Sequence, residues 1–143
     1  MTMRILLPVD ASPCSLRAVR HLAEHVAWFR EAPDIHLLHV QPPVPLAGAL
    51  GHVGKETLRE HYLEESRPHL AEASRILDEA GRTYTVHVHV GLAAEVIVRV
   101  AGDLTADLVV MGTHGRSGIA GLVLGSVANQ VLQQSPCPVL LVK

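Results

Sequence analysis

The chain has 143 residues, with 12 Lys and Arg against 14 Asp and Glu, and a formal net charge of −2 when histidine is neutral. This length fits one domain spanning residues 1–143, and the charge gives no basis for a nucleic-acid or anionic-membrane partner. One Trp, two Tyr and one Phe are too few for a platform on which bases could stack, and two cysteines are too few for a disulfide framework or a structural zinc site.

No apolar run approaches the roughly 18 residues that a membrane span requires. The apolar stretch near the N-terminus meets Asp10 too soon to be a secretory signal. We therefore expect a reduced protein that resides in the cytoplasm.

The first elements read as a buried strand followed by a helix. Residues 5–9 (ILLPV) form a continuous apolar run, which is typical of a strand covered on both faces. Ser12 is a candidate N-cap and Pro13 a first helical residue. Apolar residues then recur at three- and four-residue spacing up to Val26, and we expect Pro33 to end this helix.

The same order repeats in the middle of the chain. Residues 35–40 (IHLLHV) predict a second strand, and a long connection rich in proline and glycine follows it. A helix is expected from about residue 56 to residue 80, with Gly81 as its stop. Pro68 falls inside this stretch and predicts a kink or a break there.

Residues 84–90 (YTVHVHV) alternate between apolar and polar side chains, which indicates a half-exposed strand. We expect the valines to take the buried side and His87 and His89 to face solvent on an edge strand. This arrangement needs no metal, and we expect no metal site at these histidines.

The last third of the chain adds two more strand–helix steps. The expected elements are a short helix carrying Val96, Ile97 and Val100, a buried strand at 107–111, a helix at about 125–134 and a final strand at 138–142. Strands and helices that alternate in this way predict an α/β fold of three layers, with a parallel sheet covered by helices on both faces.

The connection after the fourth strand is unusually rich in glycine. Five glycines fall within the fourteen residues from Gly112 to Gly125, and a helix begins directly afterwards. Glycines let backbone N–H groups converge on an anion, and the first turn of a helix adds further unpaired N–H groups. Composition alone also allows a plain surface loop, because neither the Walker A nor the GxGxxG pattern is present.

The spacing of this segment resembles that of the universal stress protein family. The shared features are Gly112-x2-Gly115-x9-Gly125-Ser126, the N-terminal segment LPVDAS at 7–12, and the C-terminal segment SPCPVLLV at 135–142. The resemblance covers essentially the whole chain, and the complete glycine pattern is that of the family's ATP-binding branch.

The resemblance implies a five-stranded, Rossmann-like sheet in the order 3-2-1-4-5, which puts Asp10 opposite Gly112 at the point where ligands bind in such sheets. It implies ATP as the ligand, with Mg²⁺ held through the phosphates. The implied contacts are Pro8, Val9 and Asp10 at the nucleoside, Val40 at the adenine, Met111 and Gly112 at the ribose, and Gly115, Arg116, Gly125, Ser126 and Val127 at the phosphates.

Several of these residues have simpler explanations. Asp10 or Ser126 could only cap a helix, and Arg116 could be a solvated loop charge. Pro8 cannot donate to a strand ladder, so it fits a central strand only if pairing ends there. Cys14 lies near a helix N-terminus, which could lower the pKa of its thiol.

The final strand is apolar and lies at a sheet edge in the family order, where an uncovered strand is prone to pair with another chain. The resemblance implies a homodimer through Val139–Val142, a contact that suits two-fold symmetry.

The leading hypothesis is an ATP-binding module that regulates or protects in the stress response. We expect no dedicated enzyme activity, but slow ATP hydrolysis or self-phosphorylation is open. His114 is the titratable group of the loop that suits proton transfer near neutral pH, and we expect it to point to solvent. The alternatives are a nucleotide-free dimeric interaction domain and a nucleotide-hydrolysing or adenylyl-transferring enzyme.

Overall fold

The structure, a computed structural model, describes residues 2–43, 54–115 and 124–143. Its five strands are β1 (Arg4–Pro8), β2 (Asp34–Gln41), β3 (Tyr84–Val90), β4 (Leu108–Gly112) and β5 (Val139–Val142). Its helices are α1 (Pro13–Glu24), α2 (Lys55–Glu79), α3 (Ala93–Asp103) and α4 (Ser126–Gln134), with a short 3-10 helix η1 (Val26–Trp28). All strand pairs are parallel, and their order β3-β2-β1-β4-β5 confirms the predicted topology.

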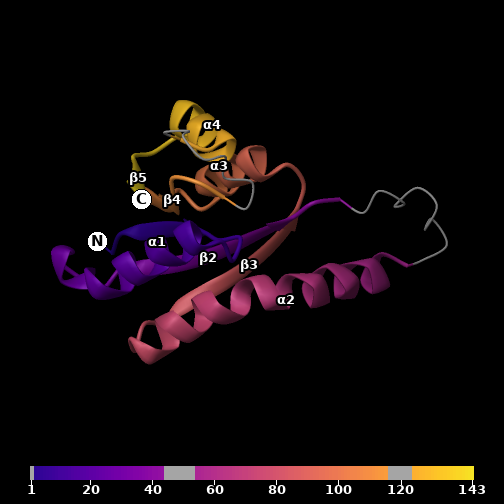
Figure 1. Ribbon diagram of the computed structural model, residues 1–143, viewed down its shortest axis with the longest axis horizontal. Coiled ribbons are helices and arrows are strands. Elements are labelled where there is room, and N and C mark those ends of the chain that lie inside the picture. The colour runs from indigo at the N-terminus through magenta and orange to yellow at the C-terminus, as the bar shows by residue number, and fades with distance from the viewer. Residues whose placement is uncertain (1, 44–53, 116–123) are drawn as a thin grey trace.

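The sheet is the middle of three layers, as predicted, with α1 and α2 on one face and α3 and α4 on the other (Figure 1). Successive residues of β1 serve opposite faces: Ile5 and Leu7 pack with α1 and α2, whereas Leu6 packs with α3 and α4. All three side chains are fully buried. A strand buried on both faces needs an uninterrupted apolar sequence, and this explains the run at the start of the chain. No helix within the described residues combines the length and the apolar character needed to cross a bilayer.

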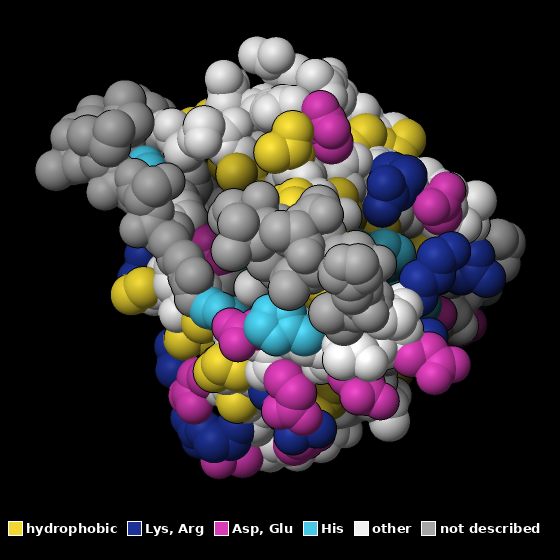
Figure 2. All heavy atoms as spheres, turned by 90° about the vertical axis from the view of Figure 1, so that its right-hand side faces the viewer, with side chains coloured by type: hydrophobic (Ala, Val, Ile, Leu, Met, Phe, Trp, Pro, Cys, Tyr) yellow, Lys and Arg dark blue, Asp and Glu magenta, His cyan; other side chains and the backbone are white. Residues whose placement is uncertain are grey.

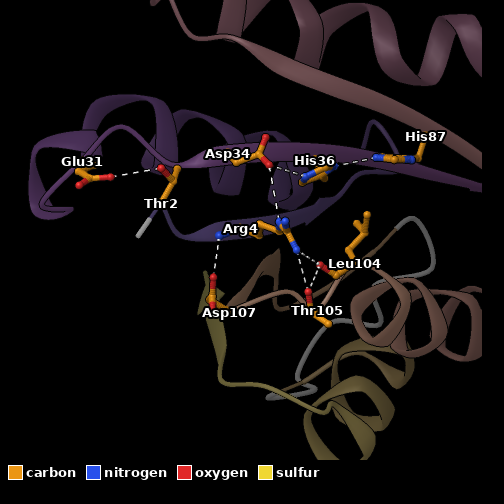
Figure 3. Close-up of polar contacts among 9 residues, drawn as sticks. All are labelled: Thr2, Arg4, Glu31, Asp34, His36, His87, Leu104, Thr105 and Asp107. Atoms are coloured by element: carbon orange, nitrogen blue, oxygen red, sulfur yellow. Dashed lines mark hydrogen bonds and ion pairs between the residues drawn. The ribbon is translucent and has the colours of Figure 1, made fainter.

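Arg4 ties the amino-terminal ends of the strands together (Figure 3). Its backbone N–H donates to the carboxylate of Asp107 at 2.8 Å, and its guanidinium donates to the carbonyl of Leu104 and the hydroxyl of Thr105. These bonds fix the turn between α3 and β4, in which Thr105 adopts a φ of 49°. These bonds therefore hold the register of β4 against β1 at the amino-terminal ends of the two strands.

The first helix begins as expected but ends earlier. The hydroxyl of Ser12 accepts the N–H of Ser15 at 3.1 Å, so the predicted N-cap is confirmed. The helix stops at Glu24, and the expectation that it continues to Pro33 is wrong. The chain turns through η1 instead and thereby returns Phe29 to the core next to α1.

The second long helix runs without interruption past Pro68, so the expected break is absent. Its buried side chains lie on both sides of the proline and hold the helix on the sheet: Tyr62, Ser66, Leu70, Ala73, Ile76 and Leu77. Gly81 ends it as predicted, with a φ of 69°. The N–H of Arg82 donates to the carbonyl of Leu77, and the N–H of Gly81 donates to that of Asp78. This pair of hydrogen bonds is a Schellman motif.

The edge strand β3 differs from expectation on both of its faces. Val86 and Val90 are 45% and 37% exposed, because they line an open groove beside the first half of α2 rather than the closed core. His87 is half-buried, and its Nε2 lies 2.8 Å from Nδ1 of His36 on β2 (Figure 3). Burial, followed by the neighbouring rings of His36 and His89, lowers the pKa of His87. Alternation alone does not indicate how far a covering helix extends along a strand.

We predict that Gly112→Ala lowers the free energy of unfolding by about 1–3 kcal/mol, the usual cost of overpacking. A Cβ at Gly112 would lie 2.8 Å from the backbone carbonyl carbon of Cys14, so the first turn of α1 would have to move. The control is Gly102→Ala in α3, where the added Cβ meets nothing within 4 Å and helix propensity favours alanine by about 0.5 kcal/mol. Denaturant unfolding compares the two, and equal stabilities would contradict this packing role.

Candidate functional site

A pocket opens at the carboxyl ends of the central strands. Its described lining comes from β1, β2 and β4, from the segments that follow β1 and β4, and from α1, α3 and α4: Pro8, Val9, Asp10, Ser15, Leu38, Val40, Ala93, Ile97, Met111, Gly112, His114, Gly115, Val127 and Ala128. The chain leaves β1 toward α1 on one face and leaves β4 toward α4 on the other. The pocket therefore lies where the strand order reverses, which is where open parallel sheets bind their ligands.

The pocket gathers eight of the residues predicted from the sequence: Pro8, Val9, Asp10, Val40, Met111, Gly112, Gly115 and Val127. Gly125 and Ser126 lie next to it at the start of α4 but do not line it, and Arg116 lies outside the described residues. Sequence reasoning missed Ser15, Leu38, Ala93, Ile97, His114 and Ala128. The four-residue spacing of Ala93 and Ile97 was the available signal, because it places both on one face of α3.

Pro8 is part of the reason that a pocket exists here. The β1–β4 ladder pairs Ile5 with Leu108 and Leu6 with Val109 and goes no further. The N–H of Val9 donates to Leu38 of β2, so in an alternating ladder the nitrogen of Pro8 faces the β4 side. A residue with no donor thus stands where β1 and β4 part. The condition that pairing must end at Pro8 is met on that side.

A tight turn presents Asp10 to the pocket. One carboxylate oxygen accepts the N–H of Ser12 at 2.9 Å, and the N–H of Asp10 donates to the hydroxyl of Ser15 at 3.1 Å. Between them Ala11 adopts a φ of 64°, a left-handed conformation that costs a non-glycine residue about 1–2 kcal/mol. Strain of this kind persists only where surrounding bonds hold it.

Gly115 lies directly beside this carboxylate. A Cβ on Gly115 would lie 2.7 Å from the second carboxylate oxygen of Asp10. The missing side chain therefore leaves room for the acid, and it also leaves the backbone of Gly115 open to a ligand beside it.

The glycine-rich connection is closed at its base by backbone bonds. The N–H of Gly125 donates to the carbonyl of Thr113 at 2.7 Å, and the N–H of Thr113 donates to Val142 of β5 at 3.0 Å. Gly125 is the N-cap of α4 and Ser126 its first residue, and within the described residues no side chain caps this end. The interpretation of Ser126 as a capping residue is therefore wrong, because the capping position belongs to Gly125.

The backbone of Val40 faces the pocket. Leu38 directs its carbonyl toward β1, where Val9 donates to it, and Gln41 directs its carbonyl toward β3, where Gly91 donates to it. Since main-chain groups alternate along a strand, the N–H and C=O of Val40 face the β1 side. The β1–β2 ladder ends at Pro8, so one donor and one acceptor project together into the open end of the pocket.

The described lining holds one carboxylate, that of Asp10, and neither Lys nor Arg. On the face seen in Figure 2, acidic and basic side chains are interspersed rather than gathered by sign. Among the described residues, no three metal-ligating side chains converge on one point. Within the described lining, the groups that suit a negatively charged ligand are backbone N–H groups and the N-terminus of α4.

Besides Asp10, His114 is a titratable group of the pocket lining, and Cys14 lies next to the lining residue Gly112 without lining the pocket itself. His114 lines it half-buried, and its Nδ1 lies 3.0 Å from the hydroxyl of Thr113, so it does not simply point to solvent as expected. Burial acts to raise the pKa of the Cys14 thiol. Hydrogen bonds from the Thr113 side chain and from the backbone of His114 and Thr113, with the charge of Arg17, outweigh it and lower that pKa.

Comparison with known proteins gives one consistent family. The model of the universal stress protein family matches residues 1–143. The chain is 34% identical over 140 residues to universal stress protein MJ0531 of Methanocaldococcus jannaschii, covering 98% of this chain and 81% of that protein. It is 35% identical over 143 residues to a universal stress protein of Thermus aquaticus, covering 100% of both.

Solved structures agree in fold. The structure of MJ0577 from Methanocaldococcus jannaschii superposes with a TM-score of 0.82 at 29% identity, covering 100% of this chain and 96% of that one. A universal stress protein solved in complex with cAMP superposes with a TM-score of 0.74 at 26% identity, covering 99% and 97%.

We predict that Thr113→Val raises the pKa of the Cys14 thiol, because it removes the side-chain hydrogen bond that favours the thiolate. The measurement is a pH titration of thiolate ultraviolet absorbance in a Cys137→Ser background, where Cys14 alone reports. Thr85→Val, on the exposed side of β3, is the matched control. A titration curve of Thr113→Val that coincides with the control would contradict the assignment.

Proposed function

The chain belongs to the universal stress protein family, and from this we propose that it binds an adenine nucleotide, with ATP as the favoured ligand, in the pocket between Asp10 and α4. Binding would make it a cytoplasmic, nucleotide-dependent regulatory or protective module of the stress response, with residues 1–143 acting as one binding unit. The observation that carries the proposal is the convergence of eight motif residues on one pocket at the strand-order reversal.

The paired backbone groups of Val40 supply the selectivity for adenine. Adenine carries an N–H donor and a ring-nitrogen acceptor side by side, which suits one backbone C=O and one N–H. Guanine presents its donor and acceptor in the reverse order. The N–H of Val40 would then face a donor and its C=O an acceptor, and these unsatisfied groups would cost binding energy. The apolar side chains of Leu38 and Ile97 give the base an apolar surround.

The phosphates would extend from Gly115, which lies beside Asp10, toward the start of α4. The N–H groups of the first turn of α4, starting at Ser126, and the open backbone of Gly115 suit phosphate oxygens. Arg116 belongs to the same proposed set. Mg²⁺ would be held mainly through the phosphates and water, as this ion commonly is. A universal stress protein of the same fold was solved in complex with cAMP, which supports an adenine nucleotide as the ligand.

Turnover of the bound nucleotide is proposed to be slow at most. A hydrolase needs a group placed to take a proton from the attacking water. His114 is the titratable histidine of the described lining, and its Nδ1 is already paired with the Thr113 hydroxyl. Self-phosphorylation on Ser126 remains part of the proposal as the alternative slow reaction.

We predict that the purified protein carries or takes up ATP and prefers it to GTP by at least about tenfold, since a mismatched pair of buried hydrogen bonds costs about that much or more. Mass spectrometry under non-denaturing conditions detects a co-purifying nucleotide, and calorimetric titration compares the two triphosphates.

Gly125→Val is expected to abolish ATP binding. A Cβ there already lies 3.2 Å from the Thr113 carbonyl oxygen, and the larger side chain would displace the loop base.

The control for Gly125→Val is Gly102→Ala, which lies far from the pocket and has open space. ATP affinity unchanged in Gly125→Val, or in the parallel variant Gly115→Val, would refute the role of this loop. Absence of any nucleotide affinity in the wild-type protein would favour the nucleotide-free interaction domain.

We further propose a homodimer through β5. This strand lies at the edge of the sheet, and all four of its apolar residues remain partly exposed. The carbonyl of Pro138 accepts a bond from Val109 of β4, and that of Val142 accepts one from Thr113 just after β4, so the N–H of Leu141 faces the free edge. Antiparallel pairing with the same strand of a second copy would satisfy that edge and bury it.

Leu141→Pro is predicted to convert the dimer to a monomer, because it removes an outward N–H without touching the bonds to β4. Leu141→Ala is the matched control: it loses the same side-chain packing but keeps the donor. Analytical ultracentrifugation gives the mass of each. Equal masses for the two variants would argue against edge pairing.

A further inference from the structure

The turn that delivers Asp10 is held from outside as well as from within. Inside the turn, Asp10 bonds to Ser12 and Ser15. From β2, Leu38 accepts the N–H of Val9 at 2.8 Å, and Nδ1 of His39 lies 3.0 Å from the Val9 carbonyl oxygen. Both backbone groups of the residue before Asp10 are thus fixed by the neighbouring strand.

His39 is built into this position. Its side chain is buried, with the residue only 4% exposed, on the α2 face of the sheet. Its ring stacks on that of His69 of α2, with centroids 4.6 Å apart and planes within 10°. Nε2 lies 3.0 Å from the side-chain amide of Gln41. A ring stacked on one side and bonded at both nitrogens cannot rotate away from Val9.

The direction of the bond to Val9 follows from its chemistry. A carbonyl oxygen can only accept, so Nδ1 of His39 carries the proton and donates it. This fixes the tautomer and makes His39 the donor, supplied by another strand, that restrains the segment running into the left-handed Ala11. With the proton on Nδ1, Nε2 accepts, so Gln41 has to present its amide NH2 there, which exchanges Oε1 and Nε2 of that side chain.

On the basis of the proposed function, we propose that His39 is a positioning residue for the nucleotide, which holds the Val9 carbonyl and thereby keeps the Asp10 carboxylate presented to the pocket. His39 itself does not line the pocket. It acts through the backbone of Val9, from the face of the sheet opposite to α3 and α4.

The proposal specifies which part of the ligand is affected. Asp10 stands at the proposed nucleoside end, whereas Gly125 and Ser126 stand at the phosphate end. Loss of the His39 donor should therefore lower the affinity for adenosine, AMP and ATP by the same factor. A change near Ser126 should weaken ATP more than adenosine.

The experiment compares three variants by calorimetric titration with adenosine, AMP and ATP. His39→Leu removes the donor and is expected to weaken all three ligands by about tenfold, the effect of one net hydrogen bond. His39→Asn keeps an N–H on the atom attached to Cγ, where Nδ1 stands, and is expected to restore most of the affinity. His36→Leu is the control, since His36 lies on the same strand but on the opposite face, where it bonds to His87 (Figure 3).

A purely structural role predicts a different pattern. His39→Leu affinity equal to that of the wild type overturns the proposal, and so does a loss that His39→Asn does not restore while its melting temperature matches the wild type. A loss confined to ATP also overturns it, because that would place the effect at the phosphates.

A second readout separates this proposal from the proposed function. Amide exchange at Ser12, whose N–H bonds to Asp10, should accelerate in His39→Leu and recover in His39→Asn. If the wild-type protein binds no adenine nucleotide, the proposed function fails, and the nucleotide role of His39 fails with it. Amide exchange then still decides whether His39 holds the turn, since unchanged exchange at Ser12 overturns that step by itself.

Discussion

The site depends on one event in the sheet, the parting of β1 from β4 after Leu6. Up to that residue the central strand is paired on both sides and buried on both faces, so it is the most constrained part of the fold. Beyond it, Pro8 offers no donor toward β4, and β1 stays bound to β2 alone through Val9. The crevice is thus opened by a missing hydrogen bond, and its walls stay rigid because the rest of the ladder is intact.

Three glycines keep this crevice open for three different reasons. Gly112 lies against the backbone of Cys14, so its missing side chain lets β4 pack on the first turn of α1. Gly115 leaves room for the carboxylate of Asp10, and Gly125 lets the loop base close on Thr113. A motif that reads as a phosphate loop is therefore partly a packing requirement. Part of its glycine content would be needed even without a ligand.

The sequence was sufficient for the strands and for the location of the site, because buried parallel strands and their carboxyl ends depend on local apolar runs and on topology. It was insufficient where a helix end or the exposure of a side chain depends on residues that are distant in the sequence. Glu24 ends α1 because Phe29 returns to the core, and Val86 stays exposed because α2 does not close over β3. His39 escaped notice for the same reason, since its partners Val9 and His69 are brought to it only by folding.

The charged groups of the described pocket limit how much negative charge on a ligand it can balance. Asp10 is negative, and the described lining has no Lys or Arg to offset either it or a phosphate. The first turn of α4 contributes only about half a positive charge. Under the proposed function, a triphosphate would bring more negative charge than these described groups offset, and Mg²⁺ held through the phosphates, together with Arg116, would balance it without a protein cage.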